Sequence, residues 1–169
     1  MHGGGFIALS SDTTQDYTRK WAKSLKIPVF SIDYSVAPQE TFPKALNEVY
    51  IAYKYIISRL SKCSNINPKK IILAGDSAGG NLVCSLMAII LKEGIKVPHA
   101  ILLAYPAVDL RKQFTPSKVN SFNHPILQPS LLNLCLSSYI GSNINGATIN
   151  PLISPLLLTE NFVNSKNGG

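Results

Sequence analysis

The sequence predicts an α/β fold in which a mainly parallel, doubly wound sheet is flanked by helices. Apolar, β-rich runs at 27–33, 71–74 and 100–105 alternate with longer helical patterns, and this rhythm is typical of βαβ units joined by right-handed crossovers. A Gly-x-Ser-x-Gly turn, Gly75 to Gly79, directly follows the second run. Because ligands of such sheets bind beyond the carboxyl ends of the strands, the functional site is expected near this turn.

Composition fits one folded domain. The 169 residues are 46% hydrophobic and 15% charged, which excludes a disordered chain. The net charge of +7 comes mostly from scattered lysines, not from the clustered basic and aromatic residues of nucleic-acid surfaces. Peripheral association with an anionic membrane or lipid-droplet surface stays open.

Three cysteines, Cys63, Cys84 and Cys135, lie far apart in apolar surroundings. They are expected to be buried free thiols and not a disulfide framework or a metal site. The longest apolar stretch, 82–91, is too short to cross a bilayer, and no secretory leader opens the chain. These features favour a reducing, cytoplasmic compartment.

The turn around Ser77 has the composition of a strand–nucleophile–helix elbow. A serine at the tip of such a turn is strained, and Gly75 and Gly79 allow strand and helix to approach because they lack a Cβ. Ser77 would project its Oγ above the sheet, next to Asp76. The amide of Ala78, at the start of the following helix, would point at an oxyanion formed on Ser77.

A glycine-rich loop, residues 2–6, is the second candidate motif. Its successive glycines, Gly3, Gly4 and Gly5, allow backbone amides to approach a ligand closely. Such a His-Gly-Gly-Gly loop is suited to complete an oxyanion hole. His2 is expected to brace the glycines by hydrogen bonding rather than to act as a base.

The remaining elements follow from periodicity. Tyr17, Trp21 and Leu25 lie on one face of a helix over about 15–25. The run 27–33 predicts a buried strand that ends at Asp33, which could be a catalytic acid but is expected to fix a loop by accepting hydrogen bonds from backbone amides. Amphipathic and apolar patterns predict two long helices, from Pro43 to about Lys62 and from Asn81 to Glu93, the second closed by Gly94.

Residues after 110 are less regular. A short helix is expected over 130–139, within a segment, 110–150, that could form part of a cap over the site. The proline-bounded stretch 150–156 is expected to be ordered, and 161–169 is expected to be a frayed end.

Together these motifs make the sequence resemble the hormone-sensitive lipase family of α/β-hydrolases. The resemblance covers most of the chain and rests on His2–Phe6, Asp33–Pro38, Phe42–Leu46, Gly75–Asn81 and Tyr105–Pro106. It implies a serine carboxylic ester hydrolase that acts on acylglycerols or related neutral lipid esters and needs no cofactor or metal. By motif match, Ser77 is the nucleophile, Gly4, Gly5 and Ala78 donate to the oxyanion, and Gly3 shapes the loop. Gln39 stands where the family often has Glu.

The acid and base of a Ser–Asp–His triad are not evident after Ser77. His99 precedes a strand and His124 lies in a cap-like loop, while Asp109 comes too early and Glu160 is isolated. The sequence is therefore expected to hold a single incomplete catalytic domain over 1–169, which is inactive alone. The alternative is a non-catalytic small-ligand receptor of the same fold, since the resemblance also includes plant hormone receptors that lack the base.

Overall fold

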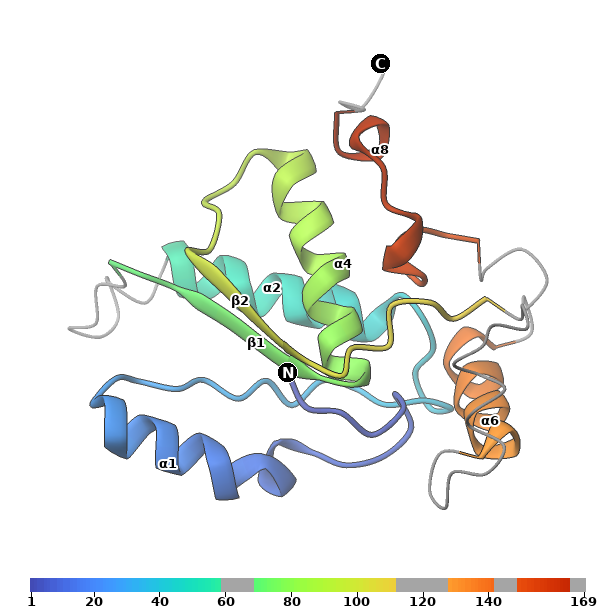
Figure 1. Cartoon of the computed structure of the whole chain (residues 1–169), viewed down its shortest axis with the longest axis horizontal. Helices are drawn as coiled ribbons and strands as arrows, with labels where there is room; N and C mark the ends of the chain where they lie inside the picture. Colours follow the sequence, from blue (N-terminus) through green and yellow to red (C-terminus); the bar gives the residue numbers. More distant parts are fainter. Residues whose placement is uncertain (59–68, 112–127, 142–148, 165–169) are drawn as a thin grey trace.

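The computed structural model describes residues 1–58, 69–111, 128–141 and 149–164, and Figure 1 shows their arrangement. The elements in chain order are the 3₁₀ turn η1 (Ser11–Thr14), α1 (Gln15–Leu25), α2 (Lys44–Ser58), β1 (Ile72–Asp76), α4 (Ala78–Glu93), β2 (Ala100–Ala104), α6 (Pro129–Ile140), η3 (Pro155–Leu157) and α8 (Glu160–Asn164).

The described sheet consists of β1 and β2, which are parallel, with Ile72 opposite Ala100 and Asp76 opposite Ala104. Helix α4 connects the two strands and packs mainly against β1, and α2 packs against α4. A strand, a crossover helix and a parallel strand form the βαβ unit that the sequence predicts. The predicted α/β fold with a parallel sheet is confirmed.

The strand predicted over 27–33 is wrong. Residues 28–36 form neither a helix nor a strand, and Val29 and Phe30 are 37% and 47% exposed. Apolar, β-branched residues favour an extended backbone, but a ladder also needs a partner strand in register. Pro28 in addition has no N–H to donate to one.

Apolar faces of α2 and α4 form the core. Leu46, Val49 and Tyr53 of α2 are buried in one hydrophobic cluster with Leu82, Leu86 and Ile90 of α4. This confirms the amphipathic interpretation of the first helix and the core interpretation of the second. The second helix starts at Ala78, three residues earlier than predicted, and Gly94 ends it in the left-handed conformation (φ 63°).

The stretch 150–156 is ordered, as expected, because α4 holds it. Asn81 Nδ2 donates to Ile153 O at 2.8 Å, and Ser85 Oγ donates to Leu152 O at 2.8 Å. The expected frayed end is wrong over 161–164, which belong to α8 and pack against α4. Residues 165–169 lie outside the described chain.

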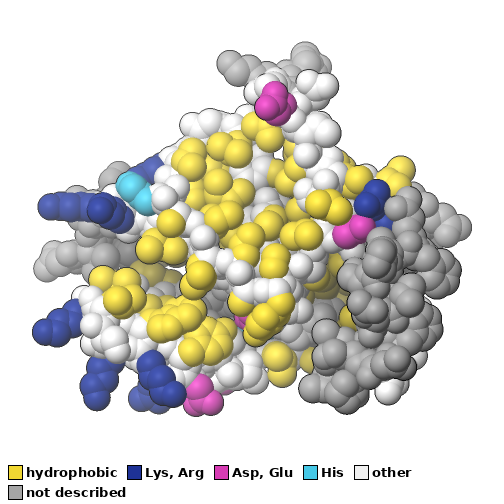
Figure 2. Space-filling model, in the orientation of Figure 1, with side chains coloured by type: hydrophobic (Ala, Val, Ile, Leu, Met, Phe, Trp, Pro, Cys, Tyr) yellow, Lys and Arg dark blue, Asp and Glu magenta, His cyan; other side chains and the backbone are white. Residues whose placement is uncertain are grey.

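Surface character differs across the molecule. Hydrophobic side chains gather in the middle of the face in Figure 2, and most of the visible Lys and Arg side chains lie at its left and lower left. No helix of the described residues is long and apolar enough to span a membrane. Cys84 and Cys135 are free, half-buried thiols, while Cys63 lies outside the described residues.

Candidate active site

Ser77 occupies a strained turn at the carboxyl end of β1. Its φ of 51° and ψ of −115° lie outside the regions that residues with a side chain usually adopt. Backbone hydrogen bonds on both sides hold it there, because Ser77 N donates to Ala104 O at 2.9 Å and Ser77 O accepts from Ala107 N at 3.0 Å. The turn therefore has the constrained geometry predicted for a nucleophile elbow.

Two glycines of the turn are required by backbone contacts. A Cβ on Gly75 would lie 2.4 Å from Gly79 O, so the strand and the helix touch directly at this point. A Cβ on Gly79 would lie 2.3 Å from Met1 O and 2.5 Å from His2 O. The start of the glycine loop therefore rests on the first turn of α4, and the structure brings the two predicted motifs together.

The glycine loop turns sharply through Gly4 and Gly5, which have φ values of 104° and 62°. Gly4 O accepts hydrogen bonds from Ile7 N and Ala8 N, while the amides of Gly4 and Gly5 donate to no other described residue. Gly3 lies against Asp76, where an added Cβ would be 2.4 Å from Oδ2. Asp76 also accepts a hydrogen bond from the Tyr17 hydroxyl of α1 at 3.3 Å.

A segment not predicted to support the site, residues 33–37, holds the glycine loop from one side. The Tyr34 hydroxyl donates to His2 O at 2.6 Å, and the two rings stack with centroids 4.2 Å apart. Ala37 N donates to Phe6 O at 2.8 Å. His2 Nδ1 donates to Gly3 O at 2.8 Å, a contact that suits a bracing residue. Tyr34 was missed as a supporting residue, although it lies in the quoted Asp33–Pro38 motif.

Helix α6, from the predicted cap-like segment, covers the other side of the loop. The ring of Tyr139 stacks on Phe6 with centroids 3.8 Å apart. A Cβ on Gly5 would lie 2.6 Å from Cys135 Sγ, so this helix sits directly on the loop backbone. Residues 112–127 and 142–148 of the segment lie outside the described chain.

Tyr34 and Tyr139 offer a matched test of this support. Both are buried, and burial raises the pKa of each phenol well above its ordinary value. The Tyr34 hydroxyl has a partner, whereas the Tyr139 hydroxyl has none among the described residues. We therefore expect Tyr34→Phe to lower the free energy of unfolding by about 1–2 kcal/mol, because His2 O loses its hydrogen-bond donor. Tyr139→Phe should leave it unchanged or raise it. Urea unfolding measures both, and an equal loss in the two variants would contradict this assignment.

Among the described residues, none of the candidates for the triad acid and base that follow Ser77 contacts Ser77. His99 lies at the amino end of β2, where its Nδ1 accepts from Ile71 N at 3.2 Å, at the opposite end of the sheet from Ser77. Asp109 pairs with Arg111 at 2.8 Å, and Glu160 begins α8. His124 lies outside the described residues. Asp33 accepts a hydrogen bond from Ser11 N at 2.8 Å, the loop role expected for it, and Gln39 is exposed.

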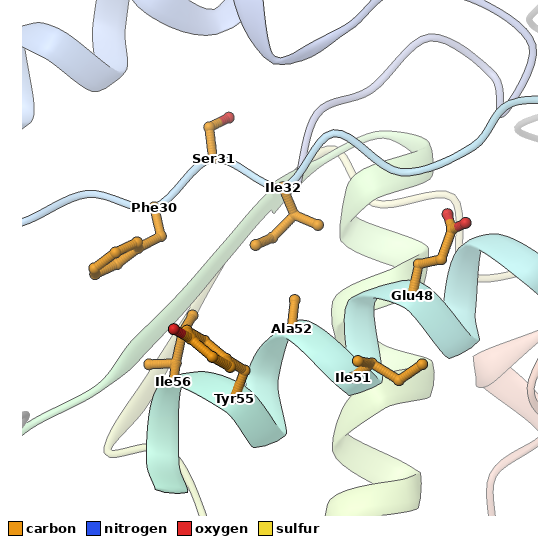
Figure 3. A pocket seen from close by; sticks show the side chains of 8 residues that line it. All are labelled: Phe30, Ser31, Ile32, Glu48, Ile51, Ala52, Tyr55 and Ile56. Carbon is orange, nitrogen blue, oxygen red and sulfur yellow. The ribbon is translucent and has the colours of Figure 1, made fainter. Parts of the chain in front are cut away.

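One groove of the described residues lies away from these motifs. It measures about 430 Å³ and lies between residues 30–32 and α2, where Figure 3 shows Phe30, Ile32 and Tyr55 directed toward it. Neither this groove nor the smaller one beside α8 is lined by Ser77 or the glycine loop. The described residues also contain no group of three side chains that could bind a metal ion.

Comparisons with known proteins agree with this geometry. A family model described as the alpha/beta hydrolase fold matches residues 1–165. Hormone-sensitive lipase of Mus musculus is 40% identical over 142 residues, which are 84% of this chain and 19% of that protein. The Homo sapiens hormone-sensitive lipase is 41% identical over 142 residues, 84% of this chain and 13% of that protein.

A solved esterase structure also resembles this chain. The esterase of Pyrobaculum calidifontis superimposes with a TM-score of 0.86 at 32% identity, over 94% of this chain and 51% of that one. The chain thus spans about half of this solved esterase and less than a fifth of the mammalian lipases. From residue 1 to residue 165 it belongs to the α/β-hydrolase family, among the members similar to hormone-sensitive lipase.

Proposed function

We propose that this chain carries the nucleophile and the oxyanion donors of a serine carboxylic ester hydrolase. The observation that carries the proposal is the contact between two motifs: the strained Ser77 turn and a glycine loop whose Gly4 and Gly5 amides donate to no described residue. Unpaired backbone amides beside a strained serine are suited to a developing negative charge.

In the proposed reaction, Ser77 Oγ attacks the ester carbonyl carbon and the carbonyl oxygen becomes the oxyanion. The amides of Gly4, Gly5 and Ala78 would donate hydrogen bonds to that oxygen, and Gly3 would shape the loop. Collapse of the intermediate expels the alcohol and leaves an acyl group on Ser77, which water then removes. The Ser77 proton needs a base in the first step.

No described histidine hydrogen-bonds to Ser77, which supports the proposal that the chain carries the nucleophile half of the site. Loss of one triad member leaves catalysis about 10³–10⁴-fold above water. We therefore expect the chain alone to hydrolyse esters very slowly. The proposed substrates of the complete enzyme are acylglycerols or related neutral lipid esters, because two relatives that are about 40% identical are named lipases.

A covalent probe tests the nucleophile without requiring turnover. An alkyl fluorophosphonate forms a Ser77–phosphorus bond and releases fluoride, provided that a base accepts the serine proton. Imidazole added to the solution can serve as that base. We expect intact-protein mass spectrometry to detect one adduct that forms much faster with imidazole, and no adduct on Ser77→Ala.

Each outcome of the labelling separates the candidate functions. Imidazole-dependent labelling of Ser77 supports a nucleophile that lacks its base. Rapid labelling without imidazole, together with ester turnover that Ser77→Ala abolishes, would overturn the expectation that the catalytic domain is incomplete. His124 would then be the first candidate for the base. Absence of an adduct in folded protein under both conditions would overturn the hydrolase proposal and favour the small-ligand receptor.

A further inference from the structure

Gly5 is held differently from its neighbours in the glycine loop. Gly4 O accepts hydrogen bonds from two amides further along the loop, and Phe6 O accepts one from Ala37 N at 2.8 Å. Gly5 lies between these two anchored carbonyl groups, but neither its own N–H nor its C=O forms a hydrogen bond with another described residue. Because glycine adopts many backbone conformations at similar energy, the direction of the Gly5 amide depends on other contacts.

The side chain of Cys135 in α6 makes such a contact with Gly5. A Cβ built on Gly5 would lie 2.6 Å from Cys135 Sγ and 3.3 Å from Cys135 Cβ. Apart from the chain neighbours of Gly5, no other atom of the described residues lies within 4 Å of that position. The Cys135 side chain therefore occupies the space that a side chain at position 5 would take, and its sulfur lies against the Gly5 α-carbon.

Helix α6 is anchored one turn further on, at Tyr139. This residue is buried, and its ring stacks on Phe6 and meets the ring of Phe42 edge-on, with centroids 5.9 Å apart. Tyr139 O also accepts a hydrogen bond from Phe42 N at 2.8 Å. Residues four apart lie on the same face of a helix. Anchoring Tyr139 therefore also fixes Cys135 against Gly5.

We propose that Cys135 is a positioning residue that sets the direction of the Gly5 amide in the oxyanion hole. The proposal rests on the proposed function, because that function assigns Gly5 as an oxyanion donor. Misplacement of a catalytic group by about 1 Å can lower a rate about 10²-fold. Loss of one oxyanion donor lowers it by about 10²–10³-fold. One sulfur atom at this contact is therefore enough to control the reactivity of Ser77.

The environment of the Cys135 thiol suits support and not a reaction of its own. The side chain is half-buried, and burial raises the pKa of the thiol above its ordinary value. The sulfur is therefore uncharged at neutral pH and adds no negative charge beside the oxyanion. A nucleophilic cysteine would instead need a lowered pKa. Cys135 thus acts through the space that its sulfur fills.

Fluorophosphonate labelling of the full chain with imidazole measures this positioning, because the phosphoryl oxygen of the probe takes the place of the ester carbonyl oxygen. Cys135→Ala removes the sulfur that lies against Gly5. We expect its maximal rate constant of labelling to fall about 10- to 100-fold. The probe concentration that gives half the maximal rate should not change, since oxyanion donors act on the transition state.

Two further variants make the labelling result specific. Cys135→Ser keeps an atom at the position of the sulfur and should retain most of the wild-type rate. Cys84→Ala removes another half-buried free thiol, on α4, and should be labelled as the wild type is. Circular dichroism establishes that each variant is folded under the labelling conditions.

Gly5→Ala tests the same contact without any reaction at Ser77. In the wild-type background the new Cβ would meet Cys135 Sγ and would also be strained by the φ of 62°. In the Cys135→Ala background the sulfur is absent, so the backbone strain remains without the close contact. We expect Gly5→Ala to lower the urea midpoint less in that background than in the wild type, because residues in contact show non-additive effects. A Cys84→Ala background should not change the effect of Gly5→Ala.

Other outcomes would overturn the role of Cys135. They are a maximal labelling rate that Cys135→Ala leaves unchanged, an equal loss of that rate in Cys84→Ala, a Cys135→Ser chain as slow as Cys135→Ala, and additive effects of Gly5→Ala and Cys135→Ala on the urea midpoint. Absence of labelling in the wild type would overturn the proposed function and the positioning role with it. Coupling between Gly5 and Cys135 in that case would show a structural contact alone.

Discussion

Gly75→Ala is expected to lower the free energy of unfolding by about 3 kcal/mol, since overpacking that displaces backbone costs about 1–3 kcal/mol and occasionally more. The added Cβ would lie 2.4 Å from Gly79 O and 2.5 Å from Gly79 C. Both are backbone atoms in the first turn of α4, so no side-chain rotation can relieve the overlap. Strand β1 and helix α4 would have to separate at the turn that holds Ser77.

Gly94→Ala is the matched control for that substitution. Gly94 ends α4 with a φ of 63°, and an added Cβ there would meet no atom within 4 Å. Its cost should therefore be the left-handed backbone strain alone, about 1–2 kcal/mol. Urea unfolding followed by circular dichroism ranks the two variants. A Gly75→Ala chain as stable as Gly94→Ala would show that strand and helix are not in contact at the elbow.

The contact at Gly75 also explains why the elbow could be predicted from sequence. A Gly-x-Ser-x-Gly turn is set by backbone sterics over five residues, and those sterics are encoded by which residues lack a Cβ. The same holds for Gly3, Gly4 and Gly5, whose conformations and contacts exclude a side chain. The periodicities of α2 and α4 were equally informative, because the buried positions repeat along one helix face.

The features that sequence reasoning missed depend on partners distant in the chain. The run 27–33 has strand composition, but whether it joins a ladder depends on a neighbour with matching register, which propensity does not encode. Tyr34 and Tyr139 lie on opposite sides of the glycine loop and are separated by about a hundred residues. Nothing in their local spacing indicates that one binds His2 O and the other stacks on Phe6.

Asn81 is a further residue whose role appears only in the folded chain. It is fully buried in the first turns of α4, and its Nδ2 donates to Ala107 O at 2.7 Å and to Ile153 O at 2.8 Å. One amide group thus joins the segment after β2 to the stretch 150–156. Ala107 also donates its own N–H to Ser77 O, so this junction borders the nucleophile turn.

Asn81→Ala should lower the free energy of unfolding by about 2–4 kcal/mol, because two carbonyl oxygens lose their donor and each unpaired buried group costs about 1–3 kcal/mol. Ser85→Ala removes a single bond, to Leu152 O, from the same helix and should cost about 1 kcal/mol. Urea unfolding at pH 7 would measure both losses, and the larger one should belong to Asn81.

Asn81→Asp removes the N–H donors of the side chain but keeps its volume, so it separates two effects that Asn81→Ala combines. The two side chains have nearly the same shape, but an ionised carboxylate has no N–H and would face the oxygens of Ala107 and Ile153. Asn81 Oδ1 has no hydrogen-bond partner in the described chain, so no donor is in place to receive the new charge. We therefore expect Asn81→Asp to destabilise at least as much as Asn81→Ala at pH 7 and to recover in part as the pH falls and the carboxyl group is protonated. If Asn81→Asp were instead close to wild type, packing volume and not hydrogen bonding would hold the segment beside Ser77.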